Sequence, residues 1–592
     1  MTHIDIPVLI VGGGGAGLTA SMLLSTLGVK SLLVSAQAST SILPKAHVLN
    51  QRSMEILGDV GVAGRIYAVG TPPENMRSSA WYAGFAGAQP NAGRRLARLE
   101  AWGAGGDNPH WKAASACLST NLPQIRLEPL LKQRAEELAG NAIRFSNELI
   151  DFEQFDDHVV AQIRDHVTGQ DYTVRAAYML ACDGGKTIGA RLGVQLQGLR
   201  DVAREVSVYM SADLSRWARD PDVLIRWIWV PEAAALSVLV PMGPTRWGPD
   251  SEEWVFHLNY PNEDPRALDD DRVEADMRAA LGIGDHPVTI HKISRWTLEG
   301  VLADTFRVGR TFLVGDAAHR HPPTGGLGLN SAIHDAHNLC WKIAAVLKGE
   351  AGETLLDSYE PERRAATGRN VQRSVENAMN QFGAGPSLGF EQGGDPAANW
   401  ACIDRYWGED AGDIAYRRNV LKLLATQSME FDELNVEAGF RYTSGAVIGD
   451  GTPPAETPDD IRIYEPDTRP GSPLPHAWLE DPDGNRLPLM SLVKPGRFLL
   501  IAGEDGSAWC DAAASLSTVL GVQIDAVRIG HADGDYRDPR SNWARYRQIS
   551  RAGAILVRPD RYVAWRNPGG SDTPRTELAD ALSAVLGRAL AA

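Results

Sequence analysis

Cysteine is scarce in this sequence, and the segments that direct a chain into or across a membrane are missing. Only five cysteines occur among 592 residues, and they form neither a C-x-x-C pair nor a metal-binding spacing. This argues against a disulfide framework and a zinc site, and favours reduced thiols in the cytoplasm. No basic segment precedes the first apolar run, and no apolar run reaches about 18 residues, so we expect neither a signal peptide nor a membrane span.

Positive charge is also in deficit. The net charge is -16, whereas a protein that binds a nucleic-acid backbone needs a basic surface. We therefore expect no nucleic-acid partner, although a local basic pocket for an anionic substrate remains compatible with this charge. Hydrophobic residues make up 44% and charged residues 22% of the chain, as in ordinary soluble globular proteins. The length predicts roughly three to four domains.

A glycine-rich loop stands near the N-terminus, where Gly12, Gly14 and Gly17 form the pattern G-x-G-x-x-G. The apolar run Pro7–Val11 before it is typical of a buried parallel strand, and the residues after it have the periodicity of a helix. Glycine at these places allows a tight turn and lets backbone N–H groups approach a pyrophosphate at the helix N-terminus. The sequence therefore predicts a βαβ dinucleotide-binding unit.

The next predicted strand, Val29–Ser35, ends without the acid that usually binds the ribose hydroxyl groups of a dinucleotide. Ser35 stands at that place, and a serine hydroxyl binds a sugar hydroxyl more weakly than a carboxylate does. We therefore expect Arg52 to share the recognition of the adenosine part.

Two stretches far downstream complete the pattern. Ala181–Gly185 ends a predicted strand in the turn Asp183-Gly184, and Val314–Asn330 presents Asp316 at the end of another strand. Ligands bind at this edge of a parallel sheet, where a carboxylate can accept hydrogen bonds from ribityl hydroxyl groups. A glycine run then opens a helix whose N–H groups would stabilise negative charge on a reduced flavin. The residues assigned to this end of the cofactor are Gly326, Gly328, Leu329 and Asn330.

Some residues of the third stretch also have a purely structural interpretation. Asp316 could cap a helix, and for His319 and His321 we favour packing or loop hydrogen bonds over catalysis. The three stretches are far apart in the chain, as expected if several parts of the fold hold one large cofactor. We interpret them as binding FAD in an enzyme.

The remaining chain has three further regions. Short β-rich segments between about residues 200 and 300 predict a substrate-binding sheet inserted in an FAD-binding domain that spans residues 1–395. A helical segment and linker follow over residues 396–478, and a separate α/β domain over residues 479–592. Alternation could place Trp227, Trp229, His257 and Tyr260 in an aromatic pocket, although each is more often plain core.

The three motifs resemble the single-component, FAD-dependent aromatic hydroxylases with the p-hydroxybenzoate hydroxylase fold, over about residues 5–364. Pro44–Leu57 and Leu122–Pro129 are similar to the phenol hydroxylase branch. The resemblance implies an α/β fold: a Rossmann-like FAD-binding domain of the glutathione-reductase type, the inserted sheet, and a thioredoxin-like C-terminal domain. Because that domain has Cys510 but no C-x-x-C, dithiol chemistry is not expected there.

The resemblance also implies an activity. It is NADH- or NADPH-dependent hydroxylation of a phenolic ring by O2, ortho to the hydroxyl group, through a flavin C4a-hydroperoxide. Gln124 would lie against FAD, and Asp183-Gly184 would serve both FAD and a transiently bound nicotinamide cofactor. His47 is the predicted catalytic base, since a phenolate is more nucleophilic than a phenol. Asn121 departs from the branch, which tends to carry an acid at this place.

Three alternatives remain open at this point. The same scaffold could hydroxylate a polyketide or another fused aromatic. A flavoprotein that acts mainly as an interaction module is the non-enzyme alternative. A chain of 64.1 kDa is compatible with a monomer or a homodimer.

Overall fold

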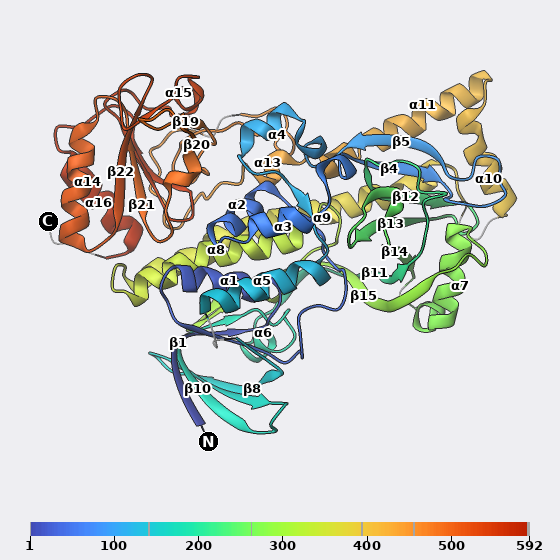
Figure 1. Ribbon diagram of the computed structural model, residues 1–592, viewed down its shortest axis with the longest axis horizontal. Helices are drawn as coiled ribbons and strands as arrows, with labels where there is room; N and C mark the ends of the chain where they lie inside the picture. Colours follow the sequence, from blue (N-terminus) through green and yellow to red (C-terminus); the bar gives the residue numbers. More distant parts are fainter. Residues whose placement is uncertain (1, 140–142, 262, 392–394, 454–455, 589–592) are drawn as a thin grey trace.

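The structure is a computed structural model that describes residues 2–139, 143–261, 263–391, 395–453 and 456–588. Three large sheets lie around two long helices, α8 (Leu327–Leu347) and α9 (Tyr359–Ser387), which cross the middle of the molecule (Figure 1). None of the helices within the described ranges combines the length and apolarity needed to cross a membrane.

The first sheet joins strands from distant parts of the chain, and its core strands are parallel. In spatial order these are β17 (Thr311–Leu313), β10 (Asp171–Ala181), β1 (Thr2–Val11), β2 (Ser31–Ser35) and β7 (Ile143–Phe145). The apolar run Val8–Val11 is buried because helices cover the sheet, as in other parallel sheets. The first half of β10 also pairs antiparallel with β9 (Val159–Asp165).

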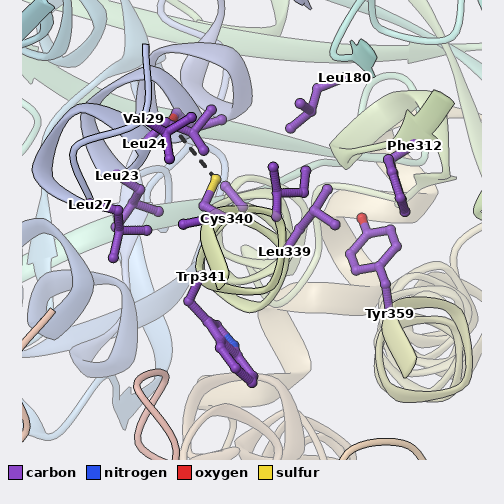
Figure 2. Close-up of a cluster of buried hydrophobic side chains, with 14 of the residues drawn as sticks. Leu23, Leu24, Leu27, Val29, Leu180, Phe312, Leu339, Cys340, Trp341 and Tyr359 are labelled. Atoms are coloured by element: carbon purple, nitrogen blue, oxygen red, sulfur yellow. Dashed lines mark hydrogen bonds between the residues drawn. The ribbon is translucent and has the colours of Figure 1, made fainter. Parts of the chain in front are cut away.

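Helix α1 (Gly15–Thr26) packs between this sheet and α8. In Figure 2, Cys340 of α8 lies beside Leu24 of α1, and its thiol donates a hydrogen bond to the Ala20 carbonyl at 3.8 Å. Trp341 points away from this cluster toward the C-terminal domain, where its ring meets Phe498 edge-on at 5.9 Å. Helix α8 therefore packs against α1 and the first sheet on one side, and against the sheet of the C-terminal domain on the other.

The second sheet has eight strands in the order β18-β15-β11-β14-β13-β12-β4-β5. The segments predicted between residues 200 and 300 are strands, as expected. The sheet also takes two strands from before that region, because β4 pairs in parallel with β12. Its members are β4 (Ser78–Ala83), β5 (Arg94–Glu100), β11 (Leu196–Ser211), β12 (Val223–Val230), β13 (Ala235–Gly243), β14 (Glu253–Tyr260), β15 (Thr289–Ala303) and β18 (His319–Arg320).

Each face of the second sheet packs against different helices. Phe256 and Trp254 on one face form a buried cluster with Met277 of α7 (Asp270–Leu281). Trp229 on the other face clusters with Leu388, which follows α9. Four helices then connect α9 to the C-terminal domain: α10 (Pro396–Asp404), α11 (Ala411–Ala425), α12 (Ser428–Phe431) and α13 (Leu434–Glu437).

The C-terminal domain has the thioredoxin-like arrangement. Its β21-α14-β22 unit is parallel, the hairpin β24-β25 is antiparallel to β21, and helix α16 follows. Cys510 lies on α14, half-buried and far in sequence from any other cysteine. The bounds are β21 (Phe498–Ala502), α14 (Ser507–Leu520), β22 (Ile524–Gly530), β24 (Ala554–Val557), β25 (Val563–Asn567) and α16 (Pro574–Leu586).

A buried ion cluster joins this domain to the helices of the FAD-binding region. Arg558 donates to both carboxylate oxygens of Glu362 at 2.7 and 2.9 Å, and Lys342 donates to the same carboxylate at 2.7 Å. The side chains of all three are 0% exposed. Despite burial, the charges of Arg558 and Lys342 hold the pKa of Glu362 at about 2, below its ordinary 4.5. The buried Glu362 carboxylate needs a cation beside it, and the C-terminal domain supplies that cation as Arg558.

Truncation of this contact is expected to destabilise the protein strongly. The Arg558→Ala substitution leaves Glu362 buried with one cation fewer, and breaking such a pair costs about 3–5 kcal/mol. Urea unfolding of both proteins measures this loss. The control Arg164→Ala breaks an exposed pair with Asp171 and should cost at most about 1 kcal/mol.

The stability that the Glu362 cluster contributes should fall at acid pH. Because the folded-state pKa of Glu362 is depressed, its contribution to stability is present above pH 4.5 and is lost as the pH falls toward 2. Equal losses in the two arginine variants, or no difference between their acid-unfolding profiles, would contradict the assigned role.

Candidate functional site

The glycine loop after β1 lies against the Asp183-Gly184 turn. A Cβ atom on Gly12 would stand 2.0 Å from the Cys182 carbonyl oxygen, and one on Gly17 would stand 1.9 Å from the Gly12 carbonyl oxygen. Gly12 also has φ +120°, which residues with a side chain rarely adopt. Only glycine fits at these two positions, so they shape the turn.

Gly14 has a different reason to be glycine. It precedes α1 as its N-cap, with no side-chain cap and no acid in the first turn. The nearest atom to a Cβ on Gly14 is Glu128 Oε1, at 3.5 Å, so the protein itself leaves room there. Since no side chain of the described residues caps α1, its first N–H groups are available to an anion.

The start of α8 packs against the start of α1. A Cβ on Gly15 would stand 2.6 Å from Cδ1 of Leu329 in α8, and Gly315 lies beside Ala16. Gly326, with φ 66°, is the N-cap of α8, again with no side-chain cap or acid in the first turn. The structure thus brings the first and third glycine stretches together, with two uncapped helix N-termini.

The two aspartates differ in their surroundings. Asp316 is exposed, and its carboxylate has no hydrogen-bond partner among the described residues. It is not a helix cap. The Asp183 carboxylate instead accepts backbone N–H groups of Gly185, Thr187 and Ile188 at 2.8–3.1 Å, and Ile188 is the first residue of the short helix α6 (Ile188–Arg191). Asp316 is therefore available to a ligand, whereas Asp183 is used locally. Gly184 has φ +72° and open space around it.

Ser35, Gln124 and Gly328, also predicted to bind the cofactor, lie on three different elements. Ser35 ends β2 beside the loop, 3.0 Å from where a Cβ on Gly13 would stand. Gln124 begins α5 (Gln124–Ala139) and donates its side-chain amide to Glu128. Gly328 lies in the first turn of α8, with the ring of His321 as its nearest neighbour, 3.8 Å from a Cβ placed there.

Asn330 positions the loops around the site. Its side-chain oxygen accepts from the Asn50 backbone N–H at 3.0 Å, and its amide group donates to the carbonyls of Val48 and Gly326 at 3.1 and 2.7 Å. Its side chain therefore fixes the segment after His47 against the start of α8.

The expectation for Arg52 needs correction. Its guanidinium pairs with Glu55 at 2.8 Å, donates to the Asp560 carbonyl, and lies 5.4 Å from the Tyr562 ring centre. These contacts turn the Arg52 guanidinium toward the C-terminal domain. The sequence around Arg52 does not reveal these contacts, because Asp560 and Tyr562 lie about 500 residues downstream.

His47 lies near the start of α5, since its carbonyl accepts the Leu122 N–H at 2.8 Å. Its Nδ1 is 2.6 Å from Asn121 Oδ1, while the Asn121 amide group donates to Thr71 Oγ1 at 2.7 Å. Since the Asn121 oxygen can only accept, the imidazole carries its proton on Nδ1 and its lone pair on Nε2. Burial lowers the pKa of His47 to about 4, against the opposing Asn121 hydrogen bond, and the charge of nearby His257 lowers it further.

Known proteins match this chain along its whole length. Residues 5–374 match the family model described as "FAD binding domain", and residues 467–589 match "Aromatic-ring hydroxylase, C-terminal". The 2,4-dichlorophenol 6-monooxygenase of Delftia acidovorans is 33% identical over 99% of each chain. A putative polyketide hydroxylase of Streptomyces halstedii is 34% identical over 98% of this chain and 97% of that one. The chain belongs to the FAD-binding aromatic-ring hydroxylases.

A solved structure supports the same assignment for this hydroxylase. The flavin-dependent monooxygenase PieE, in complex with FAD and substrate, shares 37% identity and a TM-score of 0.92, with both chains fully covered. The predicted enzyme class, the FAD cofactor and the fold class are confirmed. The interaction-module alternative is not supported.

The residues of this hydroxylase fit an FAD molecule. A cradle that a side chain on Gly14 would fill, two uncapped helix N-termini and the unpartnered Asp316 carboxylate lie at one sheet edge. These are donors for a pyrophosphate and a flavin edge, and an acceptor for sugar hydroxyl groups.

Two of the earlier expectations about histidines and aromatic residues are decided by the structure. His319 is fully buried and pairs with Asp335 at 2.7 Å, and His321 lies 2.9 Å from it, so both are structural, as favoured. Tyr260 faces the α7 side of the sheet, opposite to His257, and cannot share a pocket with it.

Sequence reasoning missed three side chains of the site. Glu128 is buried and accepts from the Ser41 N–H and from Gln124, which fixes the loop before His47. Glu205 and Ser207 on β11 hold His257. The Gln124–Glu128 pair has the i,i+4 spacing of a helix and could have been found in the sequence. The contacts of His257 depend on the register of β11 and β14, which a single sequence does not contain.

Proposed function

We propose that this hydroxylase adds one oxygen atom from O2 to a phenolic ring, ortho to its hydroxyl group, with NADH or NADPH as reductant. The similarity to a dichlorophenol monooxygenase supports a phenolic substrate. The observation that carries the proposal is the His47–Asn121 hydrogen bond, because it leaves a neutral imidazole with a free acceptor nitrogen.

FAD would be held by the residues at the sheet edge. Gly12 and Gly17 shape the turn, the N–H groups after Gly14 bind the pyrophosphate, and Ser35 contacts the adenosine part. Asp316 accepts ribityl hydroxyl groups, and the start of α8 from Gly326 to Leu329 lies at the flavin. When bound, FAD takes electrons from the nicotinamide cofactor and activates O2.

His47 acts on the substrate. Its Nε2 accepts the phenolic proton, which raises electron density on the ortho and para carbons of the ring. With a pKa of about 4 the imidazole is neutral at physiological pH, so its Nε2 keeps a lone pair. Asn121 holds it in this tautomer without adding a charge.

The Asp316→Ala substitution is expected to weaken FAD binding about tenfold without unfolding the protein. The carboxylate is exposed and has no partner within the described part of the chain, so its removal breaks only bonds to the cofactor. Equilibrium titration of apoprotein with FAD measures the change. Unaltered affinity would remove Asp316 from the proposed site.

A substrate panel tests the proposal and its alternative. Simple phenols and polycyclic phenols are screened for NAD(P)H oxidation, and the hydroxylated products are identified. We expect coupled turnover with simple phenols. Turnover of polycyclic phenols alone would favour the polyketide alternative, which the relative from Streptomyces halstedii supports. Hydrogen peroxide as the only product throughout would contradict phenol hydroxylation.

A further inference from the structure

A buried acid lies behind the turn that opens α8. Glu430 of α12 is 4% exposed, and its Oε1 accepts the Gly325 backbone N–H at 3.2 Å. Its Oε2 accepts the side-chain amide of Gln381, on α9, at 2.8 Å. Gly325 directly precedes Gly326, the N-cap of α8 that we assign to the flavin. Glu430 therefore contacts the turn that we place at the flavin.

Within the described residues, neither Glu430 nor its neighbour Glu433 is paired with a cation. Glu433, just before α13, is 1% exposed, and a Cβ on Gly325 would stand 2.7 Å from its Oε1. Neither oxygen of Glu433 accepts a hydrogen bond of normal geometry from the part of the chain described here. Arg373 of α9 is also buried, but its ion pair is with the exposed Glu376. Since burying an unpaired carboxylate is costly, the neutral carboxyl form is accessible to both acids.

The amide partner of Glu430 suits both protonation states of the acid. Gln381 donates to the carboxylate through Nε2, while its own Oε1 is buried and has no hydrogen-bond partner among the described residues. When the amide group turns over, Oε1 accepts the O–H group of the protonated acid in the same place. Burial raises the pKa of Glu430 to about 7, against the hydrogen bonds from Gln381 and Gly325 and the charge of Arg373. Glu430 can therefore gain a proton near neutral pH without losing its partners.

We propose that Glu430 takes up one proton from solvent when the bound FAD is reduced. A hydride ion from the nicotinamide cofactor brings two electrons and one proton to FAD, which leaves one negative charge on the reduced flavin. A carboxylate behind the same turn would oppose that charge, and its conversion to the neutral carboxyl form removes the repulsion. This inference rests on the proposed function, because it places the flavin at the start of α8.

The reduction potential of bound FAD, measured against reference dyes from pH 6 to 9, tests the proposal. The slope of this potential with pH gives the number of protons taken up per two electrons. The number should rise from one toward two just above pH 7, where Glu430 is ionised in the oxidised enzyme and neutral in the reduced enzyme. Above and below that range Glu430 keeps its protonation state, so the number should return toward one.

Three variants separate the proton of Glu430 from its hydrogen bond. Glu430→Gln still accepts the Gly325 N–H but cannot take up a proton, so uptake should stay near one proton at every pH. Its affinity for FAD should change less than about twofold. Glu430→Leu lacks the acceptor as well, so it should also bind FAD about tenfold more weakly. Glu148→Gln, which removes an exposed acid on β8 (Asn147–Gln154), should match the unmodified enzyme.

Two results would overturn the inference while leaving FAD binding and phenol hydroxylation intact. The first is uptake of one proton per two electrons from pH 6 to 9 in the unmodified enzyme, a result that needs no variant to fold. The second is equal proton uptake in Glu430→Gln and the unmodified enzyme, which would assign the second proton to another group. Protein that binds no FAD would instead contradict the proposed function itself.

Discussion

The His47→Gln substitution is expected to lower the rate of hydroxylation about 10²–10⁴-fold, the usual contribution of a positioned general base. The imidazole is the group with a free acceptor nitrogen and a pKa of about 4, whereas a glutamine amide cannot take a proton. Single-turnover formation of hydroxylated product, started from reduced enzyme and O2, measures this step directly. FAD binding should be unchanged, because the side chain of His47 bonds Asn121 rather than the glycine loops.

The pH profile provides a second measure of the same role. Because burial lowers the pKa of His47 to about 4, its imidazole is neutral above about pH 5 and becomes protonated as the pH falls further. The hydroxylation rate should therefore be level from pH 6 to 8 with respect to this group and fall below pH 5. This acid limb should be absent in His47→Gln. The control His291→Leu, which alters an exposed histidine on β15, should behave as the unmodified enzyme. An unchanged rate and pH profile in His47→Gln would exclude His47 as the base.

The Gly14→Ala substitution is expected to raise the Kd for FAD about 10- to 100-fold while leaving the apoprotein folded. A methyl group on Gly14 meets no protein atom closer than 3.5 Å, so it fills only the space that the pyrophosphate would use. Loss of hydrogen bonds to a charged group costs about 1.5–3 kcal/mol, which gives this range. Titration with FAD measures the affinity, and urea unfolding should change by less than about 0.5 kcal/mol.

Substitutions at two other glycines serve as controls for Gly14→Ala. In Gly17→Ala the new methyl group would stand 1.9 Å from the Gly12 carbonyl oxygen, so both the stability of the apoprotein and FAD binding should fall. Gly64 in α3 (Ala63–Val69) has no atom within 4 Å of its Cβ position, so Gly64→Ala should leave FAD binding unchanged and should not destabilise the apoprotein. Equal FAD affinities for Gly14→Ala and Gly64→Ala would show that the pyrophosphate lies elsewhere.

The convergence of the three glycine stretches could be predicted because contacts or turns within each stretch account for its glycines. Gly12 and Gly17 are required by contacts within the turn, and a strand that ends in Asp183 or Asp316 places that residue at a known edge of a parallel sheet. The strands between residues 200 and 300 were also predictable from their alternation. These signals all lie within a few residues of the element that they describe.

The errors concern contacts between distant segments. Arg52 follows a predicted motif, yet its partner Asp560 belongs to a domain at the other end of the chain. Strands β4 and β5 join the second sheet because β4 pairs with β12, about 145 residues later. The assignment of Glu205 to His257 depends on the register of β11 and β14. Such pairings need a structure, because composition and periodicity describe only each segment by itself.

The most direct test is a crystal structure of the protein grown with FAD. We expect a single FAD whose pyrophosphate accepts hydrogen bonds of about 2.7–3.2 Å from the N–H groups that follow Gly14, and whose ribityl chain donates to Asp316. Density that places these two residues against separate ligands, or FAD away from both, would contradict the proposed site.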